Sequence, residues 1–222
     1  MSLEKRHKQA HVDQWCEEGF TLIPNFFTQA EIEPIIVDFE KLYQDRGKGE
    51  GVGLPLDKNE EGAIGAGHPK QFMNIDSLPY NASAATNLIS LHPALINFAK
   101  ALLGVEEVHL YQSHTWAKYT GEADYDQAFH CDFGNHTLTV PSDDIALRTV
   151  DFIFYLTDVT DAHGALHYVT KTDSDRLLGQ GSVFAREDQQ LALKEVERSG
   201  AGPAGSLLAH SIDTFHRGTN LT

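Results

Sequence analysis

The chain has 222 residues, a formal net charge of −15 at pH 7, and 41% hydrophobic and 22% charged residues. This length and composition are typical of one globular domain with a core of its own. The acidic balance argues against nucleic-acid or anionic-membrane partners, and no apolar run is long enough for a transmembrane helix. Two cysteines and an N-terminus without the apolar stretch of a secretion signal predict a cytoplasmic protein.

The N-terminal part predicts helices around one strand. The run "VDQWCEEGF" is typical of a short helix that ends at Gly19, because glycine favours the conformation of a helix C-cap. "FTLIPNFF" predicts a strand, and "TQAEIEPIIVDFEKLY" predicts a helix with Thr28 and Glu31 at capping-box spacing. "HPALINFAKALLG" predicts another helix, which closes at Gly104.

From residue 105 onwards the sequence is mostly strand-like. Short runs rich in β-branched and aromatic residues alternate with turn signals, and one helical insert is expected over 186–198. Strands after a helical start favour a mainly β protein with flanking helices, whose core is a barrel or a double-sheet jelly roll. We expect one domain over 1–222, in which 1–104 supports a core formed by 105–222.

His130 and Asp132 stand two residues apart in "FHCDF". A His-x-Asp triplet alone carries little information in a chain with 12 histidines, and another occurs at His11 and Asp13. That other triplet lies in a helix-like segment, where positions i and i+2 point to different sides. His130 and Asp132 lie in a strand-like segment, where such positions share one face and can bind the same metal ion.

A catalytic metal needs at least one more ligand, and the 2-His-1-carboxylate triad of non-haem iron enzymes takes a second histidine. The C-terminal run "LLAHSIDTFHRGTNLT" offers His210 and His216. If 207–218 is one strand, His216 lies near its end, where a ligand can reach a barrel mouth. His210 lies in the middle of the run and is equally compatible with a core position, so spacing alone leaves the choice open.

Four segments, in this order, resemble the phytanoyl-CoA dioxygenase family of Fe(II)/2-oxoglutarate-dependent oxygenases. "EEGFTLIPNFFTQAEIEPI" resembles the family's Gly-Phe strand and helix, and "HCD" resembles its His-x-Asp. "FIFYLTDVTDAHGALHYV" resembles the strand and turn that follow, and "PAGSLLAHSIDTFHRGTNLT" resembles the strand leading to the distal histidine. The likeness covers nearly the whole chain.

The resemblance implies a double-stranded β-helix, which is a cupin-like jelly roll, with His130, Asp132 and His216 as ligands of Fe(II). It implies 2-oxoglutarate as co-substrate and O2 as oxidant, with release of succinate and CO2 and hydroxylation of a small organic molecule. Asp132 favours hydroxylation, because related halogenases lack this carboxylate. No catalytic residue is expected beyond the metal ligands.

Further residues are expected near the iron. Lys118 aligns with a lysine that some family members place near the co-substrate, and Trp116 on the same expected strand is a candidate for lining the pocket. Both are also compatible with structural positions. Phe133 and His136, which follow the ligand pair, are candidates for substrate contact.

Family members usually carry an arginine several residues after the distal histidine, where it binds the far carboxylate of 2-oxoglutarate. The sequence stops at Thr222, so we expect this arginine and a final strand to lie beyond it. Arg217 is adjacent to His216 and should therefore face away from the metal.

Two other functions are compatible with the sequence. A cupin-like metalloenzyme with a redox-neutral or hydrolytic reaction would more often hold its metal with three or four histidines. A jelly-roll metal-binding protein that does not turn over 2-oxoglutarate would fit the arginine that the sequence lacks. Succinate formation separates both from an oxygenase, whereas the substrate and the oligomeric state cannot be predicted.

Overall fold

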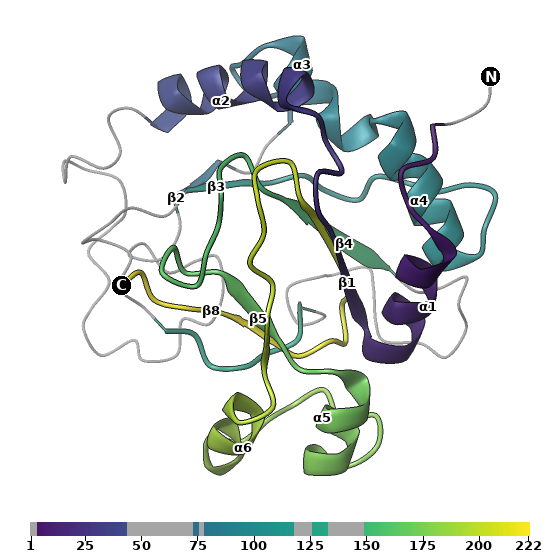
Figure 1. Cartoon of the computed structure of the whole chain (residues 1–222), viewed down its shortest axis with the longest axis vertical. Helices are drawn as coiled ribbons and strands as arrows, with labels where there is room; N and C mark the ends of the chain where they lie inside the picture. Colours follow the sequence, from purple (N-terminus) through teal and green to yellow (C-terminus); the bar gives the residue numbers. More distant parts are fainter. Residues whose placement is uncertain (1–3, 44–72, 76–77, 118–125, 133–148) are drawn as a thin grey trace.

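The computed structural model describes residues 4–43, 73–75, 78–117, 126–132 and 149–222 (Figure 1). The helices are α1 (Gln9–Glu18), α2 (Gln29–Tyr43), α3 (Ala84–Leu88), α4 (Pro93–Leu103), α5 (Lys171–Leu178) and α6 (Gln190–Lys194), with short 3-10 helices η2 (Ile89–Leu91) and η5 (Glu187–Gln189). The strands are β1 (Phe20–Ile23), β2 (Met73–Ile75), β3 (Thr115–Ala117), β4 (Val150–Phe154), β5 (Leu166–Tyr168), β6 (Arg198–Ser199), β7 (Leu207–Ser211) and β8 (His216–Gly218). Within the described ranges, no helix has the length and apolar character needed to cross a membrane.

The first sheet has the antiparallel order β1–β7–β4. In its central strand, Leu208 pairs with Leu22 on one side and with Ile153 on the other. Its outer face packs against helices, and α1 and α4 lie beside it in Figure 1. The buried residues of this cluster are Trp15, Ile23, Phe26, Phe27, Ile32, Ala94, Leu95, Phe98, Leu102, Leu207 and Ala209. The helices therefore seal this face with apolar side chains.

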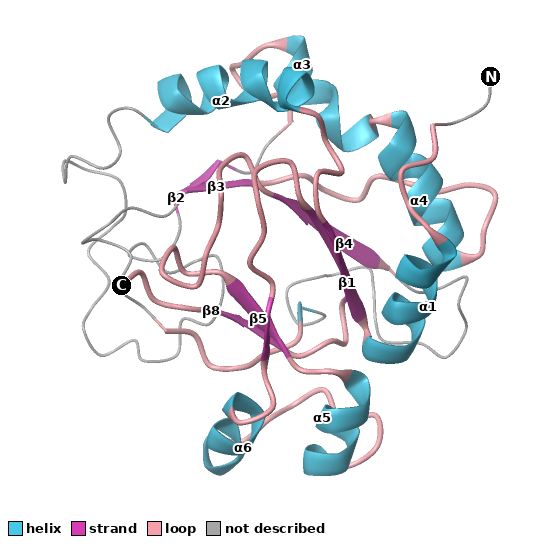
Figure 2. Ribbon diagram, viewed as in Figure 1, coloured by secondary structure: helices cyan, strands magenta, loops and turns pink. Residues whose placement is uncertain are grey.

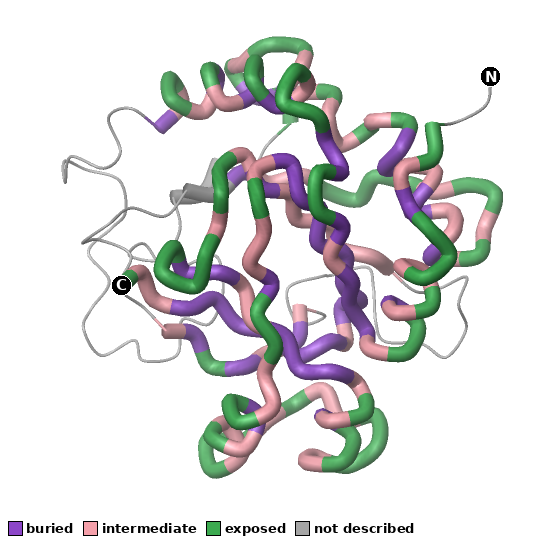
Figure 3. Tube along the Cα trace, viewed as in Figure 1, coloured by how far each residue is buried: buried purple, intermediate pink, exposed green. Residues whose placement is uncertain are grey.

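The second sheet has the antiparallel order β6–β5–β8, and α5 and α6 lie at its end (Figure 2). Tyr168 of β5 pairs with His216 of β8, and its ring stacks on Phe20 of the first sheet at 4.6 Å between centroids. Tyr155 and Leu208 complete this buried cluster. The inner faces of the two sheets therefore meet, and Figure 3 shows buried residues gathered along both.

Several predicted helix ends are confirmed. Gly19 follows α1 with φ of 86° and Gly104 follows α4 with φ of 66°, which is the left-handed conformation that glycine adopts readily. The Glu31 carboxylate accepts a hydrogen bond from the Thr28 backbone N–H at 2.8 Å, as the capping-box spacing predicted.

Other predicted elements were wrong. The expected strand over 207–218 is two strands, because β7 ends at Ser211 and a turn with a bond from Thr214 N–H to the Ser211 carbonyl precedes β8. The helical insert over 186–198 is reduced to η5 and α6. Helix α5 was not predicted, although Thr170 caps it by accepting from the Asp173 N–H.

The expectation of a mainly β protein is met only in part, because helical residues outnumber strand residues in the described part of the chain. In addition, the division at residue 104 is not a sheet boundary. Strand β1 from the N-terminal part pairs with β7, and β2 pairs with β3. The N-terminal part therefore contributes a strand to the sheet that faces the candidate site.

Candidate metal centre

His130, Asp132 and His216 offer ligand atoms that all lie within 4.8 Å of one another. His216 opens β8, whereas His130 and Asp132 lie in the described segment 126–132. Two backbone hydrogen bonds of 3.0 Å join His130 and His216, one in each direction. This bridge places the two imidazoles side by side, with 4.6 Å between ring centroids.

The hydrogen bonds of these two histidines indicate their tautomers. Nδ1 of His130 lies 2.9 Å from the Ala128 carbonyl oxygen, and Nδ1 of His216 lies 3.0 Å from the Thr214 carbonyl oxygen. Because a carbonyl oxygen can only accept, each Nδ1 carries the hydrogen and each Nε2 of a neutral ring offers a lone pair. Metal-binding histidines are held in this way.

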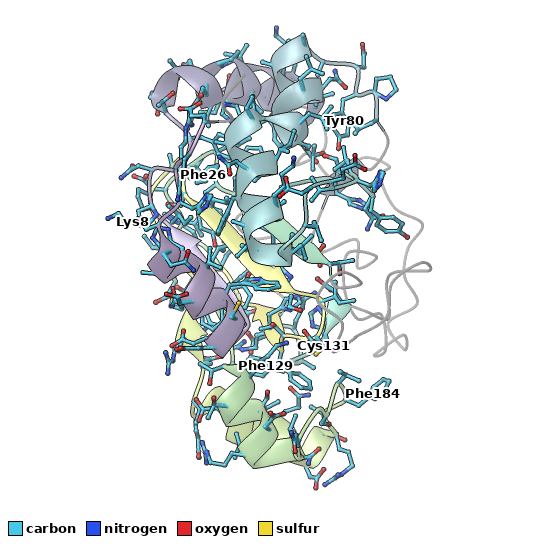
Figure 4. All side chains as sticks on the ribbon, turned by 90° about the vertical axis from the view of Figure 1, so that its right-hand side faces the viewer. Lys8, Phe26, Tyr80, Phe129, Cys131 and Phe184 are labelled. Carbon is cyan, nitrogen blue, oxygen red and sulfur yellow. The ribbon has the colours of Figure 1, made fainter. Side chains whose placement is uncertain are left out.

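Asp132 lies opposite both lone pairs. Its Oδ1 is 3.7 Å from Nε2 of His130, and its Oδ2 is 3.3 Å from Nε2 of His216. The neighbours Phe129 and Cys131 are buried on the other side, in a cluster with Val169, Leu193 and Phe215. Figure 4 shows Phe129 and Cys131 above α5 and α6. Over 129–132 the two polar ligands therefore alternate with two apolar anchors, although the predicted strand is here an isolated bridge at His130 and Asp132 lies outside any strand.

The electrostatics of the site favour an ionised Asp132 and a neutral His130. Burial alone would raise the pKa of Asp132, but the charge of His216 and hydrogen bonds from His210 and His216 hold that pKa well below its ordinary value. Burial and the neighbouring His216 lower the pKa of His130 to about 4. For His216, burial opposes protonation, but Asp132 outweighs it and the pKa is raised.

His210 lies on the first sheet and faces the same carboxylate. Its Nε2 is 3.4 Å from Oδ2 of Asp132 and 3.8 Å from Oδ2 of Asp151. His210, Asp132 and Asp151 form a second group that could hold a metal ion. Of the two histidines that spacing left open, His216 thus shares a group with His130, and His210 shares one with Asp151.

Sequence reasoning missed two polar residues around this centre. Asp151 pairs with His210 across the sheet, and the Tyr168 hydroxyl lies 3.2 Å from Nδ1 of His210. The signal for Asp151 was a charged residue inside the apolar run "TVDFIF". No local pattern marks Tyr168, because its contact with His210 spans the two sheets.

The remaining candidates fall into three cases. Arg217 forms ion pairs with Glu197 and Asp126, so it is engaged away from the metal centre as expected from its position. Lys118, Phe133 and His136 lie outside the described residues. Trp116 pairs through its backbone with Asn74.

A family model described as phytanoyl-CoA dioxygenase (PhyH) matches residues 15–222. No curated protein matches the chain significantly. Among solved structures, the non-heme alpha-ketoglutarate-dependent carbocyclase SnoK from nogalamycin biosynthesis is 18% identical, with a TM-score of 0.68 over 98% of this chain and 79% of its own.

Two further solved structures share the fold. EvdO2 from Micromonospora carbonacea var. aurantiaca is 16% identical, with a TM-score of 0.66 over 100% of this chain and 88% of its own. HygX from Streptomyces hygroscopicus, solved with nickel and 2-oxoglutarate bound, is 14% identical, with a TM-score of 0.64 over 96% and 81%. These likenesses support a jelly roll in general form, with more helix than the sequence predicted. The family model spans nearly the whole chain, and the protein therefore belongs to the phytanoyl-CoA dioxygenase (PhyH) family.

Proposed function

We propose that the protein is a non-haem Fe(II)/2-oxoglutarate-dependent oxygenase that hydroxylates a small organic molecule, and that His130, Asp132 and His216 hold the iron. The convergence of these three side chains carries the proposal. Two neutral imidazole nitrogens and one carboxylate oxygen form the donor set of the facial triad, which leaves positions for other ligands. The residues present therefore fit Fe(II).

The chain's own residues hold and orient this donor set. The carbonyls of Ala128 and Thr214 direct both Nε2 lone pairs towards Asp132, and the bridge between His130 and His216 fixes their spacing. The apolar clusters around Phe129 and Phe20 exclude water on two sides. When bound, iron with 2-oxoglutarate and O2 supplies the oxidising chemistry, with succinate and CO2 as co-products.

Structures of similar fold support a small-molecule substrate and show the range of reactions to be distinguished. HygX has been solved with hygromycin B bound, SnoK is described as a carbocyclase, and SnoN is described as an epimerase. We propose hydroxylation because Asp132 completes the triad and leaves its position unavailable to a halide. Lys118 and Trp116 are proposed to contact 2-oxoglutarate, and Phe133 and His136 are proposed to contact substrate.

Anaerobic titration with Fe(II) and 2-oxoglutarate tests the proposal. We expect the weak visible charge-transfer band of the chelated complex in the wild type and its loss in His216→Ala. His163→Ala is the matched control, because His163 is exposed and bonds to Thr160 in a turn. Under O2, the wild type should form succinate.

Two outcomes contradict the proposal in different ways. Iron binding without the band would indicate a metal protein that does not chelate 2-oxoglutarate. Iron binding of equal strength in the wild type and in His216→Ala would exclude His216 as a ligand.

A further inference from the structure

His210 and Tyr168 form a fully buried pair behind Asp132. Both residues are 0% exposed, and the Tyr168 hydroxyl lies 3.2 Å from Nδ1 of His210. His210 belongs to β7 in the first sheet and Tyr168 belongs to β5 in the second. The pair therefore spans the interior between the sheets and ends at the metal centre.

The position of one proton follows from burial. In the described part of the chain, Nδ1 of His210 is the one hydrogen-bond partner of the Tyr168 hydroxyl. A tyrosine hydroxyl has an ordinary pKa of about 10, so it carries its proton at neutral pH. A buried hydroxyl proton needs an acceptor, and Nδ1 supplies it. A neutral ring that accepts at Nδ1 carries its own hydrogen on Nε2.

With this assignment, His210 and His216 carry their hydrogens on different ring nitrogens. His216 donates from Nδ1 to a carbonyl and offers a lone pair at Nε2. His210 accepts at Nδ1 and presents Nε2–H to the carboxylates, of which Asp132 at 3.4 Å is nearer than Asp151 at 3.8 Å. Since a protonated Nε2 cannot bind a metal ion, His210 acts as a donor to a ligand.

We propose that His210, oriented by Tyr168, is a positioning residue that donates a hydrogen bond to Oδ2 of Asp132 and holds the carboxylate for binding of iron through a single oxygen. This inference rests on the function proposed above. A carboxylate restrained in this way occupies one coordination position, which preserves the others for co-substrate and O2.

Titration with Mn(II), followed by the electron paramagnetic resonance signal of the free ion, tests this inference without co-substrate or turnover. Tyr168→Phe removes the hydroxyl that sets the tautomer of His210. Tyr155→Phe is the matched control, because Tyr155 is buried in the same cluster but donates to the Gly200 carbonyl. We expect Tyr168→Phe to weaken Mn(II) binding and Tyr155→Phe to leave it unchanged.

Substitution of His210 itself provides a second test by the same Mn(II) titration. His210→Leu should weaken Mn(II) binding roughly 10- to 100-fold, the usual effect of losing a partner of a metal ligand. His210→Gln should restore most of the affinity, because its amide N–H2 can occupy the place of Nε2–H. Thermal unfolding curves of each variant show which substitutions keep the fold. If His210→Leu does not fold, the test depends on Tyr168→Phe, which removes only one oxygen atom.

The outcomes separate this inference from the proposed function. No Mn(II) binding by the wild type would overturn the metal centre and the inference with it. Normal wild-type binding with equal affinities for Tyr168→Phe and Tyr155→Phe would overturn the inference alone. Two Mn(II) ions per chain would also overturn it, because His210 and Asp151 would then be ligands of a second ion. Loss of binding in His210→Leu but not in His216→Ala would make His210 the ligand.

Discussion

The two sheets cover their outer faces in opposite ways. The first sheet lies under helices and an apolar cluster in which Phe98 and Leu207 are fully buried. The second sheet carries a polar row on its outer face, where His167 pairs across the strands with Ser199 and Arg217. Glu197, Asp126 and Asp161 supply the acidic partners of this row. The first face is thus closed by the hydrophobic effect and the second by ion pairs.

The ion pairs on the second sheet also hold the candidate metal centre together. Arg217 donates to both carboxylate oxygens of Glu197, at 2.8 and 2.9 Å, and to Asp126. Asp126 begins the segment that carries His130 and Asp132, whereas Arg217 follows His216. The ion pairs therefore tie together the two segments that supply the ligands. The apolar face supports the fold, and the charged face supports the site.

Removing a large side chain from the apolar face should have the largest effect. Phe98 packs against Phe26 and Phe152, with centroids 6.3 and 5.8 Å away. We expect Phe98→Ala to lower the free energy of unfolding by about 3–5 kcal/mol, because the cavity cannot collapse fully. Urea unfolding followed by circular dichroism measures this. Leu191→Ala is the control, since Leu191 is 74% exposed and should change stability by less than about 0.5 kcal/mol. Equal losses of unfolding free energy in Phe98→Ala and Leu191→Ala would contradict the conclusion that the apolar cluster stabilises this face.

Breaking the charged face should cost less at pH 7. Arg217→Met keeps an apolar stem near Phe129 but leaves Glu197 and Asp126 without their guanidinium partner. Removing one partner of a fully buried pair costs about 3–5 kcal/mol, but Glu197 and Asp126 are 18% and 33% exposed. Solvent screening therefore reduces the expected loss to about 1–3 kcal/mol.

The same substitution should change the response to acid. Burial raises the pKa of both carboxyl groups, but hydrogen bonds from Arg217 to Glu197 and from Lys194 to Asp126, with the charge of Arg217, lower them overall. Groups with depressed pKa values stabilise the fold above their unfolded-state pKa, 4.5 for Glu197 and 3.8 for Asp126, and lose that contribution as pH falls. The difference between wild type and Arg217→Met should narrow below about pH 4.5. A constant difference in urea midpoints between pH 7 and pH 3 would refute this assignment.

The smallest effect concerns Asp38, a buried polar residue in one of the helices. Asp38 of α2 accepts hydrogen bonds from Ser83 N–H at 2.9 Å and from the hydroxyl of Thr86 at 2.6 Å, which fixes the start of α3. Asp38→Ala should cost about 1 kcal/mol, the usual net contribution of a hydrogen bond. Asp38→Asn keeps an acceptor oxygen and should cost less. Thermal unfolding distinguishes the two, and an identical loss would assign the effect to charge.

Local signals were enough to predict part of this structure. Gly19 and Gly104 end helices because their conformation is decided within a few residues. The alternation over 129–132 predicted that His130 and Asp132 share one side and that Phe129 and Cys131 are buried elsewhere. The break between β7 and β8 could not be predicted, because distant partners fix the turn. Lys171 binds Asp213 at 2.8 Å, and the Thr214 hydroxyl donates to the Gly19 carbonyl at 2.8 Å.

Helix α5 and the role of His210 were missed for different reasons. Thr170 and Asp173 form a local capping signal, which could have predicted the start of α5. The tautomer of His210 depends on Tyr168 in the other sheet, and no pattern in a single strand contains that information.

The bridge between His130 and His216 makes metal binding part of folding. Its two partners come from distant parts of the sequence, so the ligands can meet only when segment 126–132 has docked on β8. An ion held by both segments stabilises the docked state by mass action, by about 2.7 kcal/mol at a hundred times the dissociation constant. The supply of iron would thus set the lifetime of the protein against unfolding and proteolysis as well as its activity.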